Sequence, residues 1–291
     1  MENLRGLGVA LVTPFDTKEA IDYNGLLNLL NHTAANGVDY WVALGSTGEA
    51  ITLSENEQAD LLKFISSNNP KNLPIVFGLG GNNTHALIEK FQTIDFSNVA
   101  AILSSSPAYN KPSQEGLLKH FTALADNSPK PIILYNVPGR TASNMEAVTT
   151  IKLSRHPNII GIKEASGDLL QIMEIIKGTT NDFLVISGDD LLTPSICSVG
   201  GDGLISVLAN AIPKELKFMV KSALEGDFAS SRNQAFNLLE LNTLMYKEGN
   251  PTGVKELLSQ LEICQGYVRL PLVSASDKLS KEVEQALSDC P

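Results

Sequence analysis

Short apolar runs recur along the chain and alternate with segments that carry a helical pattern of apolar positions. The runs are rich in β-branched residues and lack strict alternation, as strands covered on both faces do. They occupy residues 9–15, 40–49, 74–81, 99–107, 131–139, 159–166, 183–190 and 204–210. Between them, one helical segment stops at Gly37, and another opens with Ser54 and Glu57 in capping-box spacing. The alternation predicts a parallel sheet whose strands are joined by helices.

The number of strand–helix units selects the fold. Eight units match a (β/α)8 TIM barrel, whereas a doubly wound sheet more often has about five or six strands and a switch point in its order. The strand pattern ceases after Asn210, and residues 214–249, 251–264 and 280–290 have helical patterns. We therefore expect an α/β fold in which residues 1–222 form the barrel and residues 223–291 form a helical C-terminal region packed against it.

Composition narrows the class of partner. The chain has 291 residues and a net charge of -10, so it lacks the basic surface that nucleic acid or an anionic membrane requires. Cys197, Cys264 and Cys290 are odd in number and widely spaced, which predicts neither a disulfide framework nor a zinc site. No apolar segment approaches the roughly 18 residues of a membrane span, and the apolar run near the N-terminus is shorter than we expect of a signal peptide. These features predict a cytoplasmic protein with a small-molecule partner.

The active site of such a barrel is built at the carboxyl ends of the strands. Those ends carry "GSTGE", "PAYN", "YNVPGRT", a Lys–Glu pair and "SGDD", at 45–49, 107–110, 135–141, 163–164 and 187–190. The four histidines have no metal-ligand spacing, so we expect no metal and no cofactor. "GLGGNN" at 78–83 departs from a nucleotide-binding loop and predicts a tight turn. Asp189 and Asp190 allow an acid/base pair, but a helix start is the favoured interpretation.

Lys163 interrupts a buried strand and has two interpretations. Lysines at strand ends usually extend their ammonium group into water. Alternatively, the amine is a nucleophile, which requires a lowered pKa because a free lysine is only roughly 0.04% neutral at pH 7. Desolvation and a nearby Arg140 would lower that pKa. Schiff-base chemistry also needs proton carriers, and Tyr135, Tyr109 and Thr47 are candidates, although each alone fits an ordinary structural role.

Taken together, "GSTGE", "YNVPGRT" and "GIKEASGD" resemble the pyruvate-dependent Schiff-base lyase and synthase superfamily. The resemblance covers essentially the whole chain. "GSTGE" and the strand-end lysine are shared with N-acetylneuraminate lyase, whereas "YNVPGRT" and "SPAYNKPSQEG" are more similar to the dihydrodipicolinate synthase family. Arg140 is the residue that discriminates between the two.

This resemblance implies a reaction and a set of roles. Lys163 would condense with pyruvate, and the enamine would attack aspartate semialdehyde to give 4-hydroxy-tetrahydrodipicolinate. Tyr135, Thr47 and Tyr109 would form a proton relay, with Tyr109 supplied by a neighbouring subunit, so a homodimer or homotetramer is expected. The substrate contacts implied are Ser46 and Thr47 for the pyruvate carboxylate, Arg140 for the carboxylate of the semialdehyde, and Gly188 and Ile205 for the pyruvate pocket.

Two alternatives of different kinds remain at this point. One is an aldolase that releases pyruvate from a sialic or keto-deoxy sugar acid. The other is a catalytically inactive pyruvate-binding protein of the same fold, which would show no turnover. Assays with aspartate semialdehyde and with sugar aldehydes separate all three.

The resemblance also bears on regulation by lysine. Lysine-inhibited members bind the amino acid through Ser, His, Asn, Glu and Tyr side chains at a dimer interface. Here, the matching positions hold Ala50, Gln58, Asn82, Ala86 and Ala108, so only the Asn survives. A buried ligand ammonium without a carboxylate partner is costly. We therefore expect an enzyme that is insensitive to millimolar lysine.

Overall fold

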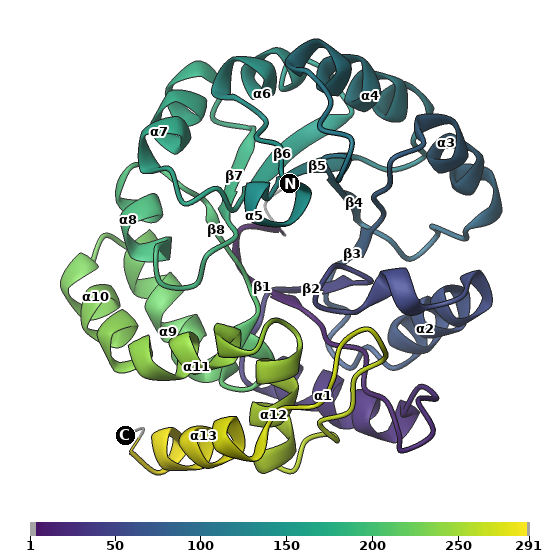
Figure 1. Cartoon of the computed structure of the whole chain (residues 1–291). Coiled ribbons are helices and arrows are strands. Elements are labelled where there is room, and N and C mark those ends of the chain that lie inside the picture. The colour runs from purple at the N-terminus through teal and green to yellow at the C-terminus, as the bar shows by residue number, and fades with distance from the viewer. Residues whose placement is uncertain (1–3, 290–291) are drawn as a thin grey trace.

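The chain folds into a closed barrel of eight parallel strands in sequential order, as the strand count predicts (Figure 1). The structure is a computed structural model that describes residues 4–289. The strands are β1 Gly6–Ala10, β2 Tyr40–Ala43, β3 Ile75–Gly78, β4 Ala101–Ser105, β5 Ile132–Asn136, β6 Ile159–Glu164, β7 Leu184–Ser187 and β8 Gly203–Ser206.

Helices surround the barrel and follow its strands. They are α1 Tyr23–Ala35, α2 Glu55–Ser67, α3 Thr84–Thr93, α4 Gln114–Asn127, α5 Pro138–Thr141, α6 Ala147–Leu153, α7 Leu169–Gly178, α8 Thr193–Ser198 and α9 Pro213–Leu224, with short 3-10 turns η2 Ala50–Thr52 and η3 Leu208–Asn210. Both helix signals are confirmed: the Ser54–Glu57 capping box is present, and Gly37 follows α1 with a φ of 85°.

The first strand begins earlier than its apolar run. Residues 9–15 predict the strand, but β1 spans Gly6–Ala10. Two glycines conceal its first half from a hydrophobicity pattern. A Cβ atom on Gly8 would lie 2.3 Å from Cε2 of the Tyr40 ring, so only glycine lets that ring pack across the strand. The bulky residue that fills this part of the barrel therefore comes from the neighbouring strand β2.

The hydrophobic core consists of two clusters, one inside the barrel and one between the strands and the surrounding helices. Leucine, isoleucine and phenylalanine side chains from strands and helices fill the outer cluster. The smaller inner cluster includes Tyr135, Ile186 and Ile205, so these three positions point into the barrel. Because successive side chains on a strand alternate between faces, inward positions near the strand ends line the barrel mouth.

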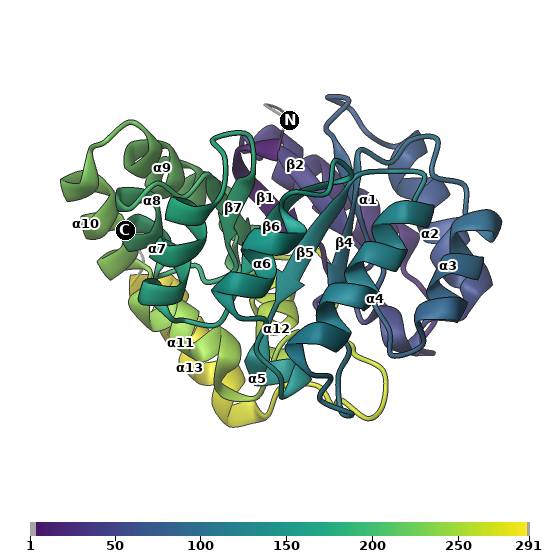
Figure 2. The same ribbon diagram turned by 90° about the horizontal axis from the view of Figure 1, so that it is seen from above.

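The C-terminal region is helical, as predicted. It comprises α10 Phe228–Asn237, α11 Leu239–Lys247, α12 Thr252–Gln260 and α13 Asp277–Asp289. In Figure 2, β5 points toward the end of the barrel where α5 and α11–α13 lie. These helices therefore cover part of the barrel mouth. The predicted division at 222/223 falls within the last turn of α9 and stays a prediction.

Two of the three cysteines lie within the described residues. Cys197 and Cys264 are buried free thiols, and Cys290 lies outside the described residues. Within the part of the chain that the structure describes, no helix is long and apolar enough to cross a membrane.

Candidate active site

Lys163 lies at the inner wall of the barrel mouth. It pairs in register with Tyr135 on β5 and with Ile186 on β7, both of which point into the barrel. Its side chain is only 5% exposed, and its Nζ atom lies 4.7 Å from the centre of the Tyr135 ring. The pKa of Lys163 is lowered to about 8, mainly by burial; the Asp190 charge opposes this shift, and the Arg140 charge adds to it. The solvated-ammonium interpretation is thus wrong for this lysine.

Gly188 directly follows β7, and Ile205 lies on β8, the two strands that come next around the barrel after that of Lys163. A Cβ atom on Gly188 would come within 3.0 Å of Lys163 Cε and 2.6 Å of Ala165 Cβ. Any other residue there would force Ala165 to shift and would crowd the lysine side chain. Ile205 is fully buried in the inner cluster. Gly188 therefore leaves space for the lysine side chain, and Ile205 is an apolar part of the barrel interior.

Tyr135 and Arg140 share the segment that leaves β5. Tyr135 is buried, and desolvation raises the pKa of its phenol while the Arg140 charge opposes that rise. Pro138 begins the short helix α5, which ends in the turn that holds Arg140. The guanidinium is exposed, and its Nη2 donates to the backbone oxygen of Asn250 at 3.4 Å. A cation therefore stands at the mouth above a buried phenol and amine.

The turn after β2 carries two hydroxyls in different surroundings. Thr47 is buried, and its Oγ1 accepts a hydrogen bond from Asn250 Nδ2 at 3.1 Å. Ser46 is exposed, and its hydroxyl has no partner among the described residues. Glu49 closes the turn in the left-handed region with a φ of 51°. No hydrogen bond within the described chain joins the hydroxyls of Thr47 and Tyr135.

Tyr109 does not join the site of its own chain. Its side chain is 90% exposed, and its φ of 69° places it in the left-handed region that non-glycine residues rarely adopt. Its hydroxyl makes no hydrogen bond to any residue of the described chain. A tyrosine presented on a strained loop points outward, away from the groups gathered around Lys163.

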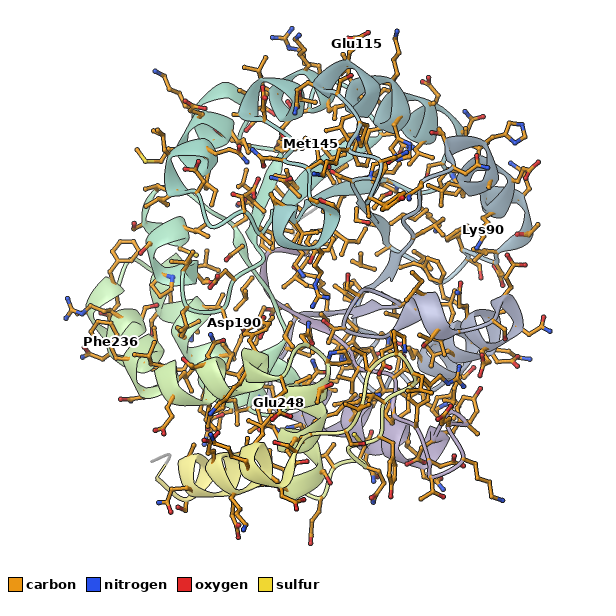
Figure 3. All side chains as sticks on the ribbon, viewed as in Figure 1. Lys90, Glu115, Met145, Asp190, Phe236 and Glu248 are labelled. Atoms are coloured by element: carbon orange, nitrogen blue, oxygen red, sulfur yellow. The ribbon has the colours of Figure 1, made fainter. Side chains whose placement is uncertain are left out.

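Asp189 and Asp190, for which the sequence favoured a helix start, differ in the structure. Asp189 behaves as expected before a helix, since its Oδ1 accepts from the backbone N–H of Leu191 and Leu192. Asp190 does not: it is buried, accepts from the Ser206 hydroxyl, and has its pKa raised to about 6 by desolvation. Figure 3 shows it between the strands and α11. Its charge is the one that favours the ammonium form of Lys163.

Glu164, next to Lys163, points to the opposite face of β6, where both of its carboxylate oxygens accept hydrogen bonds. Asn136 Nδ2 donates to both its oxygens at 3.0 and 3.1 Å, and Gln171 Nε2 and the Ser166 N–H donate at 3.1 and 2.7 Å. These bonds fix the end of β6. Because this carboxylate forms no ion pair with the lysine, Lys163 stays poorly compensated.

Among the described residues, no group of three His, Cys, Asp or Glu side chains could hold a metal ion. His120, for example, is buried beside Thr84, and burial lowers its pKa to about 4.

A buried amine in the mouth of an eight-stranded barrel, beside a phenol and under a guanidinium, is the arrangement expected of a TIM-barrel enzyme that attacks carbonyl substrates through a lysine nucleophile. The sequence profile of the Dihydrodipicolinate synthetase family matches residues 3–290. The chain therefore belongs to the dihydrodipicolinate synthetase family.

Relatives and solved structures agree over nearly the full length. The 4-hydroxy-tetrahydrodipicolinate synthase of Cytophaga hutchinsonii is 48% identical to this chain, in an alignment that covers 98% of this chain and 96% of that relative. A dihydrodipicolinate synthase crystal structure is 40% identical with a TM-score of 0.93, covering 98% and 99%. A structure of the enzyme from Cyanidioschyzon merolae with lysine bound is 34% identical with a TM-score of 0.94, covering 99% and 98%.

Proposed function

We propose that Lys163 is the nucleophile with which this chain carries out the reaction of its family. The chain condenses pyruvate with aspartate 4-semialdehyde to give 4-hydroxy-tetrahydrodipicolinate in lysine and diaminopimelate biosynthesis. The burial of the Lys163 amine at the barrel mouth carries the proposal, because it favours the neutral form that attacks the keto group. Borohydride reduction in the presence of pyruvate tests it, since the reduced adduct marks the residue that formed the imine.

The proton transfers are assigned to hydroxyl groups around the amine. Imine formation releases water, and enamine formation removes a proton from the carbon beside the imine. The ring centre of Tyr135 lies 4.7 Å from Lys163 Nζ. Thr47 and the Tyr109 of a second subunit complete the proposed relay. Ser46 and Thr47 bind the pyruvate carboxylate, and Gly188 and Ile205 shape its pocket.

Arg140 is assigned to the second substrate. It is the exposed cation above the buried amine, in a chain with a net charge of -10. A guanidinium binds a carboxylate through two parallel hydrogen bonds. Aspartate semialdehyde carries such a carboxylate, whereas the N-acetylmannosamine used by the rival aldolases does not. The position of Arg140 therefore favours the amino-acid aldehyde.

We expect the active form to be at least a homodimer. The exposure and left-handed backbone of Tyr109 support this assembly, because an outward-pointing tyrosine reaches a site only in another subunit. A two-fold axis makes the exchange reciprocal, so both sites are completed at once. Light scattering on the active enzyme checks it. A mass near 31.2 kDa with full activity would show that Tyr109 is not shared.

Regulation by lysine is expected to be absent. Gln58 donates its amide to the backbone oxygens of Ala50 and Leu53 at 3.0 and 3.1 Å, so it is engaged within its own loop. Two nearby carboxylates, Glu55 and Glu89, are each 3.3 Å from a basic side chain, Lys90 and His85 respectively. Both carboxylates already have a partner, so neither is expected to replace the carboxylate missing at Ala86.

Titration of activity with L-lysine at subsaturating pyruvate checks this expectation. Loss of one charge-assisted hydrogen bond costs about 1.5–3 kcal/mol, which weakens binding roughly 10-fold to 150-fold. Activity should therefore stay unchanged at millimolar lysine. The lysine-bound Cyanidioschyzon merolae enzyme is a suitable control for the assay. Half-inhibition of this enzyme below about 1 mM would contradict the expectation.

A further inference from the structure

The turn that bears Ser46 and Thr47 is held by the C-terminal region at two points. Both contacts come from one short stretch, the start of α12 and the residues just before it. Asn250 reaches Thr47, and Lys255 reaches Glu49. The two contacts bracket the turn, because Thr47 lies in its middle and Glu49 at its end. The C-terminal helices therefore do more than cover the barrel.

The contact at Glu49 is a buried ion pair. Lys255 Nζ lies 2.5 Å from Glu49 Oε1, and the two residues are 0% and 3% exposed. The other carboxylate oxygen accepts from the backbone N–H of Arg269 at 3.0 Å. The Phe15 ring lies under both cations, 4.1 Å from Lys255 Nζ and 4.5 Å from Arg269 Cζ. With its polar atoms satisfied and its surroundings packed, this pair fixes α12 against the turn.

The contact at Thr47 sets the direction of a hydroxyl. Because Asn250 Nδ2 donates to Thr47 Oγ1, the hydroxyl hydrogen of Thr47 is left to point elsewhere. The backbone oxygen of the same Asn250 accepts from Arg140 Nη2. One residue thus touches both the hydroxyl assigned to pyruvate and the guanidinium assigned to the second substrate.

We propose that Asn250 is a positioning residue for the condensation, which orients the Thr47 hydroxyl by donating to it while its main chain supports Arg140. This inference rests on the placement of Thr47 and Arg140 in the active site proposed above. The ion pair of Lys255 with Glu49 holds α12 in place, so the Asn250 amide is presented in one position. The C-terminal region contributes to catalysis through this amide.

Replacement of the amide tests the role. Asn250→Ala should lower kcat/KM for pyruvate about 10-fold, the equivalent of one hydrogen bond. Asn250→Asp should lower it further at neutral pH, because a carboxylate accepts the Thr47 hydrogen and turns the hydroxyl away. Asn237→Ala, an exposed Asn of the same helical region, is the matched control and should retain wild-type activity.

A double-mutant cycle with Thr47→Val separates positioning from a general structural effect. In that background, Asn250→Ala should change kcat/KM by less than about 2-fold, because the hydroxyl that it orients is gone. Suppose that Thr47→Val lowers kcat/KM. If Asn250→Ala then leaves kcat/KM unchanged, or lowers it equally in both backgrounds, the positioning role is wrong although the assignment of Thr47 to the site still holds. If Thr47→Val is as active as wild type, the assignment of Thr47 fails, and the role of Asn250 fails with it.

Discussion

Lys163→Met should lose at least ~10³-fold in kcat, because no other group in the site can form the pyruvate imine. Methionine is similar in length to lysine, so the space beside Gly188 and Tyr135 stays filled. The lysine is 5% exposed, and removing a poorly compensated buried cation should leave the fold intact. Steady-state kinetics with circular dichroism as a check on folding measure both effects.

The reactivity that this substitution removes depends on the fraction of the Lys163 amine that is neutral. With a pKa of about 8, Lys163 is ~9% neutral at pH 7, compared with roughly 0.04% for an ordinary lysine. Arg140 contributes to that shift, and Asp190 limits it. Lys177→Met, on the exposed side of α7, is the matched control and should behave like the wild type. Comparable activity of Lys163→Met and Lys177→Met would show that the nucleophile is elsewhere.

Arg140→Ala should raise KM for aspartate semialdehyde by roughly 10-fold to 150-fold, the range for loss of a hydrogen bond to a charged group. Formation of the pyruvate imine should change much less, because the guanidinium affects Lys163 only through its charge. Arg140→Lys should recover part of the loss, since an ammonium keeps the charge but not the bidentate geometry. Initial rates with each substrate varied in turn measure the two effects separately.

Arg232→Ala, on the exposed face of α10, controls for the loss of an arginine and should leave both KM values unchanged. The role given to Arg140 would be contradicted if its alanine variant lost imine formation while keeping its KM for the semialdehyde. Faster turnover of N-acetylmannosamine or glyceraldehyde than of aspartate semialdehyde would contradict the substrate preference itself.

The sequence was most informative where chemistry interrupts a local pattern. Lys163 stands out because a lysine ends an apolar strand, and the barrel follows from eight apolar runs with helices between them. The first strand was misplaced because its glycines carry no hydrophobic signal, although Gly8 is required by the packing of Tyr40. Local periodicity reports side-chain burial along one element, and it says little where glycine makes room for a neighbour.

Contacts between segments that are far apart in the sequence could not be predicted from local patterns. Asp189 and Asp190 are identical in type and adjacent, yet one caps a turn and the other is buried against Ser206. Asn250 lies 203 positions from Thr47, and no local pattern connects them. Such residues acquire their roles only when the closed barrel and the C-terminal helices bring their segments together.

Reductive trapping tests the assignment of Lys163 most directly. The enzyme is incubated with pyruvate and borohydride, digested, and mapped by mass spectrometry, with Lys163→Met treated in parallel. Our interpretation predicts a single pyruvate-derived adduct on the peptide that contains Lys163, and none in the variant. An adduct on a different lysine, or an unmodified Lys163 peptide in an enzyme that still turns over pyruvate, would contradict it.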